Sequence, residues 1–387
     1  MSSSQHASSG WFRLAVLALF TGVSGALVAQ EIQERAPSEI STSPAQETPA
    51  VGSLRHARVA IATEGGKKPL VYLARSMAES DLAELKALAP NLRILTPGSQ
   101  REALQWAPQV HGVDGRYCTP EFVRAAKQLV WVQAPSAGVD RYLTNQPLMS
   151  TERVVLTNMQ GVHGAAIADH VFAMLLTLTR DLRFHLHAKQ RGSWNRRGSG
   201  IEPIALSGKT LLVVGLGGIG REVAQRGKGF GMHVLATRRS AVEAPPYVDF
   251  QGTPEQLPAL LGQADVIVLC LPLTEETRGM IDAKAMSQMK QGAFLVNIAR
   301  GRIMDTEALT LALQSGHLAG ACLDVTDPEP LPADHPLWSM DNVVITPHVA
   351  GRAALTSKQW NQVYRENLRR FAAGEPLLNV VDKKAGY

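Results

Sequence analysis

A short apolar run that leads directly into a glycine-rich turn is the feature that most constrains the fold of this chain. Residues 211–215 (LLVVG) indicate a buried strand, Gly215, Gly217 and Gly220 follow in the spacing GxGxxG, and residues 221–230 have helical spacing. In such a unit the first glycine permits the turn, the second lets a pyrophosphate approach the backbone, and the third lets the helix pack against the strand. The phosphates then lie on the free N–H groups at the start of the helix. A glycine-rich turn without a ligand is the alternative, but both flanks favour nucleotide binding.

Further apolar runs alternate with helical or loop segments along most of the chain. After the glycine turn, five more strands are predicted, at 233–237, 265–271, 293–298, 319–325 and 343–346. Before it, strands are predicted at 70–74, 92–95, 129–132 and 154–157, with helices at 81–89 and 119–128. Strands that alternate with helices indicate parallel sheets covered on both faces. The predicted fold class is therefore α/β, with two doubly wound parallel-sheet domains, the second a Rossmann dinucleotide-binding domain.

The same patterns predict where the domains begin and end. We assign residues 54–157 to a substrate or catalytic domain and residues 158–349 to the NAD(P)-binding Rossmann domain. Residues 162–189 contain no proline and carry apolar residues at helical spacing, which predicts one long helix that crosses from one domain to the other. His185 and His187 are two positions apart and point to different sides of this helix, so we expect surface residues rather than a metal pair.

Charge and cysteine content narrow the class of protein. The chain has 387 residues, which suits about two domains. Its net charge is +5 and the sequence contains no block of like charges, so the charge pattern does not indicate a nucleic-acid partner. Its three cysteines form no CxxC pair. Cys270 and Cys322 lie in apolar strand-like runs, which predicts buried thiols rather than a disulfide or a metal site.

The start of the chain has the pattern of a secretory signal. A polar segment with a single charge at Arg13 precedes an uncharged run at 14–29 that small residues close, so we predict a signal peptide at 1–29 and export, for example to a periplasm. A transmembrane anchor is the alternative, but the run is shorter than the roughly 20 residues that a bilayer requires. Residues 30–53 are rich in Ser, Thr, Pro, Glu and Ala, which predicts a disordered linker. After cleavage of the signal we expect no stable membrane insertion.

The end of the second strand after the glycine turn bears on the choice of cofactor. An NAD site usually carries an acidic residue there for the ribose 2′-hydroxyl. This chain instead has Thr237 followed by Arg238, Arg239 and Ser240. Two guanidiniums and a hydroxyl suit a 2′-phosphate, so NADP is favoured and NAD stays possible. A solvated charge pair is the alternative reading of the two arginines.

Three residues with the chemistry of 2-oxo acid reduction stand at or just past predicted strand ends. Arg300 suits a carboxylate and carbonyl because it offers bidentate donors. His348 suits proton donation to the alkoxide that hydride attack creates, and a carboxylate such as Glu329 on its other nitrogen would fix the tautomer. Each has a structural alternative, namely a strand cap, a satisfied core histidine and a loop carboxylate. By periodicity alone, the turn at 134–142 (APSAGVDRY) indicates only a connection from strand to helix.

At this point the chain resembles the D-isomer-specific 2-hydroxyacid dehydrogenase family, from about residue 129 to residue 379. The resemblance rests on QAPSAGVD, TNMQGVHGAAIADHVFAMLL, VVGLGGIGREVA, LPLTEETRGMID, VNIARG, LDVTDPEPLPADHPLW and ITPHVAG, in that order. It implies that Arg300 binds the substrate carboxylate and carbonyl and that Glu329 pairs with the acid–base His348. It also implies a homodimer through the nucleotide domains. The substrate domain would be completed by residues 350–387, with a C-terminal helix at about 352–374.

The resemblance also assigns binding residues. The backbone amides of Ala137 and Gly138 would help to hold the substrate carboxylate, and Asp324 would lie beside the nicotinamide. The full set of cofactor-binding residues that it implies is Gly215, Gly217, Gly218, Ile219, Gly220, Arg238, Arg239, Ser240, Leu271, Pro272, Thr277, Ile298, Ala299, Asp324 and Gly351.

These observations together predict an NAD(P)-dependent oxidoreductase of the NADP-preferring glyoxylate/hydroxypyruvate reductase-like branch. It would reduce a 2-oxo acid to an (R)-2-hydroxy acid, reversibly. An aldehyde acid such as glyoxylate is the alternative substrate class. An NADP-binding sensor or interaction protein on a dehydrogenase scaffold is the alternative from another class of function, although such a protein has no use for a poised acid.

Overall fold

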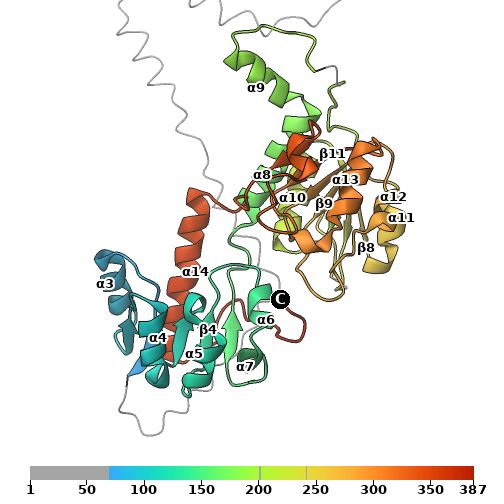
Figure 1. Ribbon diagram of the computed structural model, residues 1–387. Helices are drawn as coiled ribbons and strands as arrows, with labels where there is room; N and C mark the ends of the chain where they lie inside the picture. Colours follow the sequence, from blue (N-terminus) through green and yellow to red (C-terminus); the bar gives the residue numbers. More distant parts are fainter. Residues whose placement is uncertain (1–68, 200–201, 241) are drawn as a thin grey trace, which may run out of the picture. The chain divides into compact units, whose positions relative to one another are not determined.

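The computed structural model describes residues 69–199, 202–240 and 242–387. The predicted signal at 1–29 and the predicted linker at 30–53 lie outside the described residues. The described strands form two sheets, one with seven strands and one with five, and every pair of neighbouring strands within them is parallel. The predicted α/β fold class with two parallel sheets is therefore confirmed (Figure 1).

The seven-stranded sheet has the order β12-β11-β10-β9-β6-β7-β8. The chain starts in the middle of this sheet at β6, adds β7 and β8 on one side, and then returns to add β9 to β12 on the other. Ligands of such sheets bind at the carboxyl ends of the strands where the order reverses, here between β6 and β9. The strands are β6 Thr210–Val214, β7 His233–Thr237, β8 Phe250–Gly252, β9 Val266–Leu269, β10 Ala293–Asn297, β11 Leu318–Leu323 and β12 Val343–Ile345.

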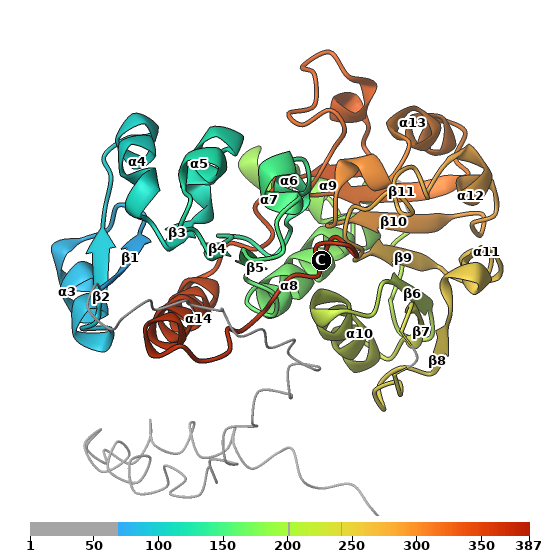
Figure 2. The same cartoon turned by 90° about the horizontal axis from the view of Figure 1, so that it is seen from below.

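Helices cover both faces of this sheet because successive strand residues point to opposite sides. Leu212 and Val214 pack in a core with α11, α12 and α13, whereas Leu211 and Val213 pack in a core with α8 and α10. Figures 1 and 2 show these two groups of helices around the strands. The helices are α8 Gly164–Thr179, α9 Leu182–Gln190, α10 Gly218–Gly229, α11 Leu257–Leu261, α12 Ala283–Ser287 and α13 Thr306–Gln314, with short 3-10 turns at η3 Pro254–Gln256, η4 Gly301–Ile303 and η5 Pro336–Ser339.

The five-stranded sheet has the order β2-β1-β3-β4-β5. Its strands are β1 Leu70–Leu73, β2 Leu92–Leu95, β3 Gly112–Asp114, β4 Trp131–Gln133 and β5 Val155–Thr157. Its connections contain α3 Glu79–Leu88, α4 Gln100–Trp106, α5 Pro120–Ala125, α6 Asp140–Leu143 and α7 Gln146–Met149, with 3-10 turns at η1 Ala107–Gln109 and η2 Gly115–Tyr117. The Thr-Pro pair opens α5 as predicted, since the Thr119 hydroxyl accepts the amide of Phe122.

The C-terminal helix α14, Ala354–Ala373, packs on one face of the five-stranded sheet (Figure 2). Its Phe371 ring lies 4.9 Å from that of Trp131 in β4, and Trp131 in turn lies 5.0 Å from Tyr72 in β1. Trp131 is fully buried and donates its indole N–H to the Thr157 hydroxyl at 2.8 Å. These aromatic contacts attach a segment from the end of the chain to strands from its beginning.

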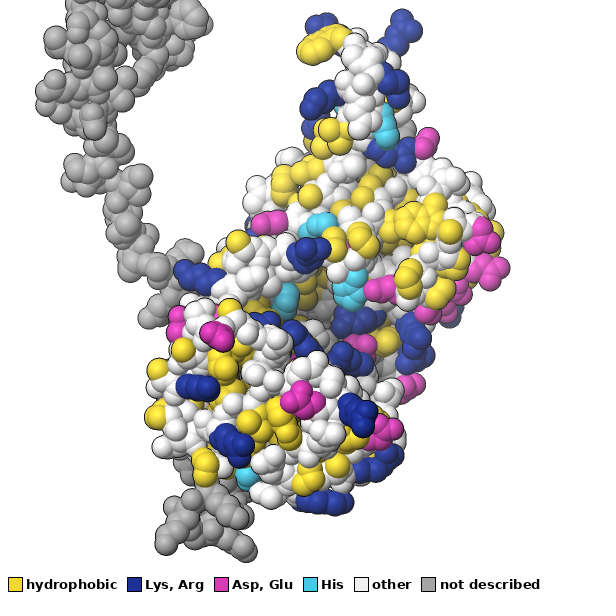
Figure 3. All heavy atoms as spheres, turned by 60° about the vertical axis from the view of Figure 1, so that its left-hand side comes forward, with side chains coloured by type: hydrophobic (Ala, Val, Ile, Leu, Met, Phe, Trp, Pro, Cys, Tyr) yellow, Lys and Arg dark blue, Asp and Glu magenta, His cyan; other side chains and the backbone are white. Residues whose placement is uncertain are grey.

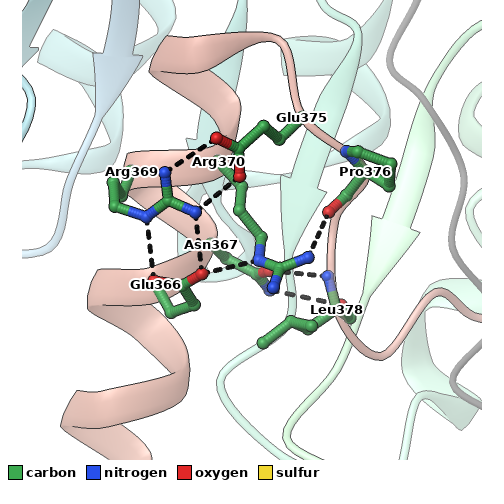
Figure 4. A network of polar contacts seen from close by, with 7 residues as sticks. All are labelled: Glu366, Asn367, Arg369, Arg370, Glu375, Pro376 and Leu378. Atoms are coloured by element: carbon green, nitrogen blue, oxygen red, sulfur yellow. Dashed lines mark hydrogen bonds and ion pairs between the residues drawn. The ribbon is translucent and has the colours of Figure 1, made fainter.

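A polar network fixes the end of α14, as Figure 4 shows. The guanidinium of Arg369 donates to both Glu366 and Glu375, while Asn367 exchanges hydrogen bonds with the backbone of Leu378. Asn367 also donates to the side chain of Gln133 at 2.9 Å. Asn367 is fully buried, so these partners satisfy polar groups that would otherwise be costly inside the protein.

The prediction of one helix over residues 162–189 is wrong. The structure has two helices, α8 and α9, because Asp181 adopts a left-handed conformation with φ 53° between them. Its carboxylate accepts the amide of Ser199 at 2.7 Å, which binds a later segment to this bend. Aspartate adopts this conformation more readily than most residues, and no proline or glycine marks the break.

Two strands went unpredicted. β3 contains Gly112 and Asp114, residues with poor strand propensity, and it is buried between β1 and β4. A Cβ at Gly112 would lie 2.8 Å from the Tyr72 ring, so close packing explains the glycine. β8 is a three-residue edge strand with an exposed Phe250 and no apolar run.

The remaining sequence expectations concern cysteines, histidines and membrane contact. Cys322 is buried as predicted, whereas Cys270 is only half-buried. His185 and His187 are exposed as predicted. Within the described ranges, no helix combines the length and the apolar composition needed to cross a bilayer.

Candidate active site

The glycine turn has the geometry that its spacing predicts. Gly215 has φ 102°, and a Cβ there would lie 2.8 Å from the Cys270 carbonyl oxygen. A Cβ at Gly220 would lie 2.1 Å from the Gly215 carbonyl oxygen, so helix and strand meet closely. A Cβ at Gly217 would meet nothing within 4 Å, and Gly217 has no side chain to cap α10. The first amides of α10 therefore border open space, which suits a pyrophosphate.

The end of β7 presents Arg238, Arg239 and Ser240. Arg238 is half-buried, donates from Nε to the Ser240 hydroxyl at 2.8 Å, and has a buried Nη1 without a partner among the described residues. Burial lowers the pKa of Arg238, and the nearby guanidinium of Arg221 lowers it further. Arg239 is exposed, and its guanidinium donates to the Tyr387 hydroxyl and lies 4.9 Å from the centre of that ring. Two cations side by side and an unused buried donor form a place for an anion.

Arg300 follows β10 and is held by short-range and long-range contacts. Asn297 is fully buried, accepts the amide of Ala299 at 3.0 Å and donates to the Arg300 carbonyl oxygen at 3.0 Å, which fixes this turn. The Arg300 guanidinium donates to the Ala299 carbonyl oxygen at 2.7 Å and to Asp140 at 3.0 Å. A Cβ at Gly138 would lie 1.6 Å from Nη2 of Arg300, so the arginine lies directly against the Ser-Ala-Gly turn.

That turn, which follows β4, presents free backbone donors. The Ala137 carbonyl oxygen accepts a hydrogen bond from Asn158 at 2.9 Å, and the Gly138 carbonyl oxygen accepts one from Ser136 at 2.8 Å. The amides of Ala137 and Gly138 have no acceptor among the described residues. Carbonyl oxygens are thus bonded while two successive N–H groups remain available, beside a guanidinium. Such an arrangement can bind a carboxylate.

Glu329 and His348 form the second part of the site. The Glu329 carboxylate lies 2.7 Å from Nδ1 of His348, and both side chains are about half exposed. His348 has φ 53°, a left-handed conformation that is uncommon outside glycine and that histidine, like asparagine and aspartate, adopts more readily than most residues. Its amide donates to the Asp324 carbonyl oxygen at 2.8 Å. With Nδ1 bonded to a carboxylate, the ring has Nε2 left for another partner.

Asp324 holds the loop that carries this histidine. It is buried at the end of β11, and its carboxylate accepts the Thr346 hydroxyl at 2.6 Å and the amides of Val349 and Ala350, each at 2.9 Å. The sequence resemblance places Asp324 beside the nicotinamide. In the structure all three of these hydrogen bonds come from the 346–350 loop, so Asp324 also fixes the backbone on either side of His348.

The other residues predicted to bind the cofactor lie in loops after β9, β10 and β12 or at the start of α10. Thr277 donates to the Pro272 carbonyl oxygen at 2.7 Å and accepts the amide of Thr274 at 2.8 Å, which closes the loop after β9. A Cβ at Gly351 would lie 3.0 Å from the His163 ring. Gly218, Ile219, Leu271 and Ile298 lie at the carboxyl ends of β6, β9 and β10, along the edge where such sheets bind ligands.

The structure thus brings the predicted residues together in two groups. Glu329 bonds to His348, and Arg300 lies against Ala137 and Gly138. No hydrogen bond or ion pair among residues 69–387, apart from the undescribed 200–201 and 241, joins the two groups. Sequence reasoning missed Asp140, Asn297 and Thr346. Asn297 belongs to the VNIARG motif and Asp140 to the QAPSAGVD motif, but Asp140 lies 160 positions from its partner Arg300, so no local pattern shows their contact.

Comparisons with known proteins agree with this description. Residues 172–350 match the family model "D-isomer specific 2-hydroxyacid dehydrogenase, NAD binding domain". A glyoxylate reductase of Pyrococcus furiosus is 37% identical over 239 residues, which are 60% of this chain and 70% of that protein.

Solved structures of similar proteins give the same result. A D-isomer specific 2-hydroxyacid dehydrogenase family protein from Aeromonas salmonicida is 34% identical, with a TM-score of 0.70 over 82% of this chain and 100% of that one. A D-isomer specific 2-hydroxyacid dehydrogenase from Xanthobacter autotrophicus, solved with NADPH and MES, is 30% identical, with a TM-score of 0.66 over 83% of this chain and 100% of that one. The chain therefore belongs to the D-isomer specific 2-hydroxyacid dehydrogenase family and is an enzyme, an oxidoreductase that uses a nicotinamide dinucleotide.

Proposed function

We propose that the protein reduces 2-oxo acids to (R)-2-hydroxy acids with NADPH, in a reversible reaction in which His348 is the acid and base. The observation that carries this proposal is the 2.7 Å contact between Glu329 and Nδ1 of His348. A carboxylate on Nδ1 fixes the orientation of the imidazole and leaves Nε2 as the ring nitrogen that can exchange a proton with the substrate. A protein that only binds the cofactor would have no use for that arrangement.

NADP is the cofactor that the residues after β7 fit best. The buried and unpartnered Nη1 of Arg238, the neighbouring guanidiniums of Arg221 and Arg239, and the Ser240 hydroxyl together match a 2′-phosphate. The open space at Gly217 and the uncapped start of α10 match the pyrophosphate. The Xanthobacter autotrophicus relative, which was solved with NADPH, adds support. NAD stays possible as the alternative cofactor.

The substrate carboxylate would lie on the free amides of Ala137 and Gly138, and the guanidinium of Arg300 would bind both the carboxylate and the carbonyl oxygen. NADPH supplies the hydride that reaches the carbonyl carbon. Arg300 lowers the energy of the negative charge that grows on the oxygen, and His348 then donates its proton from Nε2 to that oxygen. Glu329 and the Asp324-bonded loop hold the imidazole in place during this transfer.

The test is NADPH oxidation at 340 nm by purified residues 54–387 with glyoxylate, hydroxypyruvate, pyruvate and phenylpyruvate, repeated with NADH. We expect turnover with at least one 2-oxo acid and a lower KM for NADPH than for NADH. Cofactor binding without turnover on any of these acids would contradict the proposed reaction and favour a sensor. His335, which caps a 3-10 turn and lies outside both groups, gives a matched control as His335→Asn.

We further propose a homodimer formed through the nucleotide domains, with α9 and the segment after it in the interface. Leu182, Leu186 and Trp194 there are exposed by 43%, 59% and 90%, and Figure 3 shows hydrophobic side chains among basic ones over this segment. Apolar side chains exposed to this degree and close together along the chain favour a protein partner. Light scattering should give twice the monomer mass, and the double variant Leu186→Asp, Trp194→Asp should give the monomer mass. A monomeric wild type would contradict this proposal.

Export and the domain boundaries also remain proposals. The uncharged run within residues 1–29 and the Ser/Thr/Pro/Glu-rich segment 30–53 favour secretion and a linker before a substrate domain of 54–157 with 350–387 and a nucleotide domain of 158–349. Cell fractionation of the full chain and of a variant that lacks residues 2–29 tests export. Equal cytoplasmic recovery of both proteins would contradict it.

A further inference from the structure

Two arginines stand beside the carboxylate-binding turn on neighbouring strands of the five-stranded sheet. Arg75 follows β1, Arg116 follows β3, and the turn with Ala137 and Gly138 follows β4. These strands are adjacent in the order β1-β3-β4, all parallel, and Figure 2 shows them next to one another. Their carboxyl ends therefore meet at one edge, which is the edge where open α/β sheets bind ligands.

Arg75 is held in place without using its hydrogen-bonding capacity. Its guanidinium carbon lies 4.1 Å from the centre of the Trp360 ring and 5.9 Å from that of Tyr364, both in α14. Its Nε is buried without a partner, and Arg75 makes no hydrogen bond or ion pair with any residue that the structure describes. A stacked guanidinium keeps its in-plane donors free for an acceptor. A purely structural stacking residue would not need a buried N–H that bonds to nothing.

Trp360 connects this arginine to the carboxylate-binding turn. Its indole N–H donates to the Pro135 carbonyl oxygen at 2.9 Å, immediately before Ser136 and Ala137. The same tryptophan thus supports Arg75 on its face and the turn at its edge. Neighbouring strands are about 4.8 Å apart, so the ends of β1 and β4, two steps apart, are roughly 10 Å from each other. A long arginine side chain can cover part of that distance and leave room for a few carbon atoms.

The charges around this edge favour an anion. Asp140 at this edge already pairs with Arg300 at 3.0 Å. Asp114 accepts the amide of Arg116 on Oδ1 at 3.0 Å, lies 3.7 Å from Arg116 Nε, and has a buried Oδ2 without a partner among the described residues. Burial raises the pKa of the Asp114 carboxyl, and the charges of Arg116, Arg75 and Arg141 offset part of that rise. Three guanidiniums around one buried acid leave a positive excess at the strand ends.

We propose that Arg75, with Arg116 beside it, binds a second anionic group at the far end of the substrate, so that the preferred substrates are 2-oxo acids with a terminal carboxylate or phosphate. This inference rests on the proposed function, because it takes the 2-oxo acid carboxylate to lie on Ala137 and Gly138. It adds a substrate class and two specificity residues to that site.

The experiment compares matched substrates that differ in the far group. The pairs are 2-oxoglutarate with 2-oxopentanoate for a carboxylate, and phosphohydroxypyruvate with hydroxypyruvate for a phosphate, each with NADPH and purified residues 54–387. We expect kcat/KM for at least one substrate with a second anionic group to exceed that for its monoanionic partner by about 10- to 100-fold, the range for a charge-assisted contact. The pair with the larger ratio identifies carboxylate or phosphate.

Arg75→Met keeps an unbranched side chain against Trp360 and removes the cation. It should abolish the preference and leave kcat/KM for the monoanionic substrate within about three-fold, while Arg116→Met should reduce the preference in part. Arg124→Met, which changes an exposed arginine of α5, is the matched control and should change neither value. Activity on the monoanion verifies that each variant is folded.

Two results would overturn the inference and leave the proposed function intact. One is wild-type turnover of the monoanions with no preference for either substrate that carries a second anionic group. The other is a preference that survives in both Arg75→Met and Arg116→Met. Lack of wild-type turnover with every 2-oxo acid would instead overturn the proposed function itself.

Discussion

A methyl group added at Gly138 would collide with the guanidinium that we assign to substrate binding. A Cβ at this position would lie 1.6 Å from Nη2 and 2.7 Å from Cζ of Arg300, whereas Asp140 Oδ1 would be 3.2 Å away. The Gly138 backbone lies outside the left-handed region, so alanine fits the local conformation. The guanidinium must then retreat by about 2 Å to reach an ordinary contact distance.

A displacement of this size has a predictable cost if Arg300 positions the substrate. Misplacement by 1 Å can reduce a rate by about 100-fold, so Gly138→Ala should lower kcat/KM by at least that factor, or about 2.7 kcal/mol. The assay is NADPH oxidation at 340 nm, with cofactor affinity measured separately by fluorescence titration. Cofactor affinity should stay within about two-fold, because Gly138 lies on the five-stranded sheet and the cofactor contacts proposed above do not.

A double-mutant cycle identifies the cause of the loss. In an Arg300→Ala background the added methyl group has nothing to displace, so Gly138→Ala should cost less than about three-fold there. Gly229→Ala is the matched control, since a Cβ at that helical glycine meets nothing within 4 Å. An equal loss in both backgrounds, or no loss in the wild type, would refute the reasoning from the collision.

Three further predictions concern the cofactor, the acid–base pair and stability. Arg238→Asp should move the ratio of kcat/KM for NADPH over NADH toward NADH by about 10-fold or more, and an unchanged ratio would exclude a 2′-phosphate contact. Glu329→Gln replaces the charged partner of His348 by a neutral one and should lower kcat by roughly 10-fold with little change in KM, and wild-type kcat would contradict its role. Burial raises the pKa of the Asp114 carboxyl, so the folded state is stabilised by protonation and loses this contribution as the pH rises. Asp114→Asn should therefore raise Tm relative to the wild type by an amount that grows as the pH rises above the ordinary aspartate pKa of about 4, and a difference that is the same below and above that pH would contradict this.

The sequence predicts those parts of the fold that depend on neighbouring residues. One ten-residue stretch predicts the β6 strand, the glycine turn and the start of α10. Its glycines stand where the local backbone leaves no room for a side chain or where a ligand approaches. The strand β7 at His233–Thr237 has the predicted bounds, since an apolar run that begins after a polar residue marks where the strand starts. Residue type and position after a strand suffice to propose Arg300, Glu329 and His348 for the chemistry.

Features that depend on tertiary packing were not predictable in the same way. β3 reads as a loop because Gly112 and Asp114 oppose strand formation, and only the rings of Tyr72 and Trp131 that press on Gly112 explain its place in the sheet. The bend at Asp181 depends on a hydrogen bond to Ser199, in a segment that follows the helix. No periodicity within a window of sequence contains such contacts.

In the candidate site, too, some residues are predicted from the sequence and others depend on contacts between distant segments. Periodicity alone gives the Ser-Ala-Gly turn no function, and only the resemblance to a family pointed to Ala137 and Gly138. The contacts that support a role for this turn join distant segments, namely Arg300 with Asp140 and Trp360 with Pro135. Arg75, which follows the first described strand, likewise stacks on Trp360 of the last helix. No motif in the sequence predicts this contact.

The most direct test of the central claim is a single comparison of wild type and His348→Ala in the NADPH oxidation assay with the best 2-oxo acid. If His348, held by Glu329 at 2.7 Å, donates the proton, the variant should lose kcat by about 100- to 10,000-fold while it still binds NADPH with unchanged affinity. A His348→Ala enzyme that turns over at a rate close to that of the wild type would show that this pair does not carry the reaction.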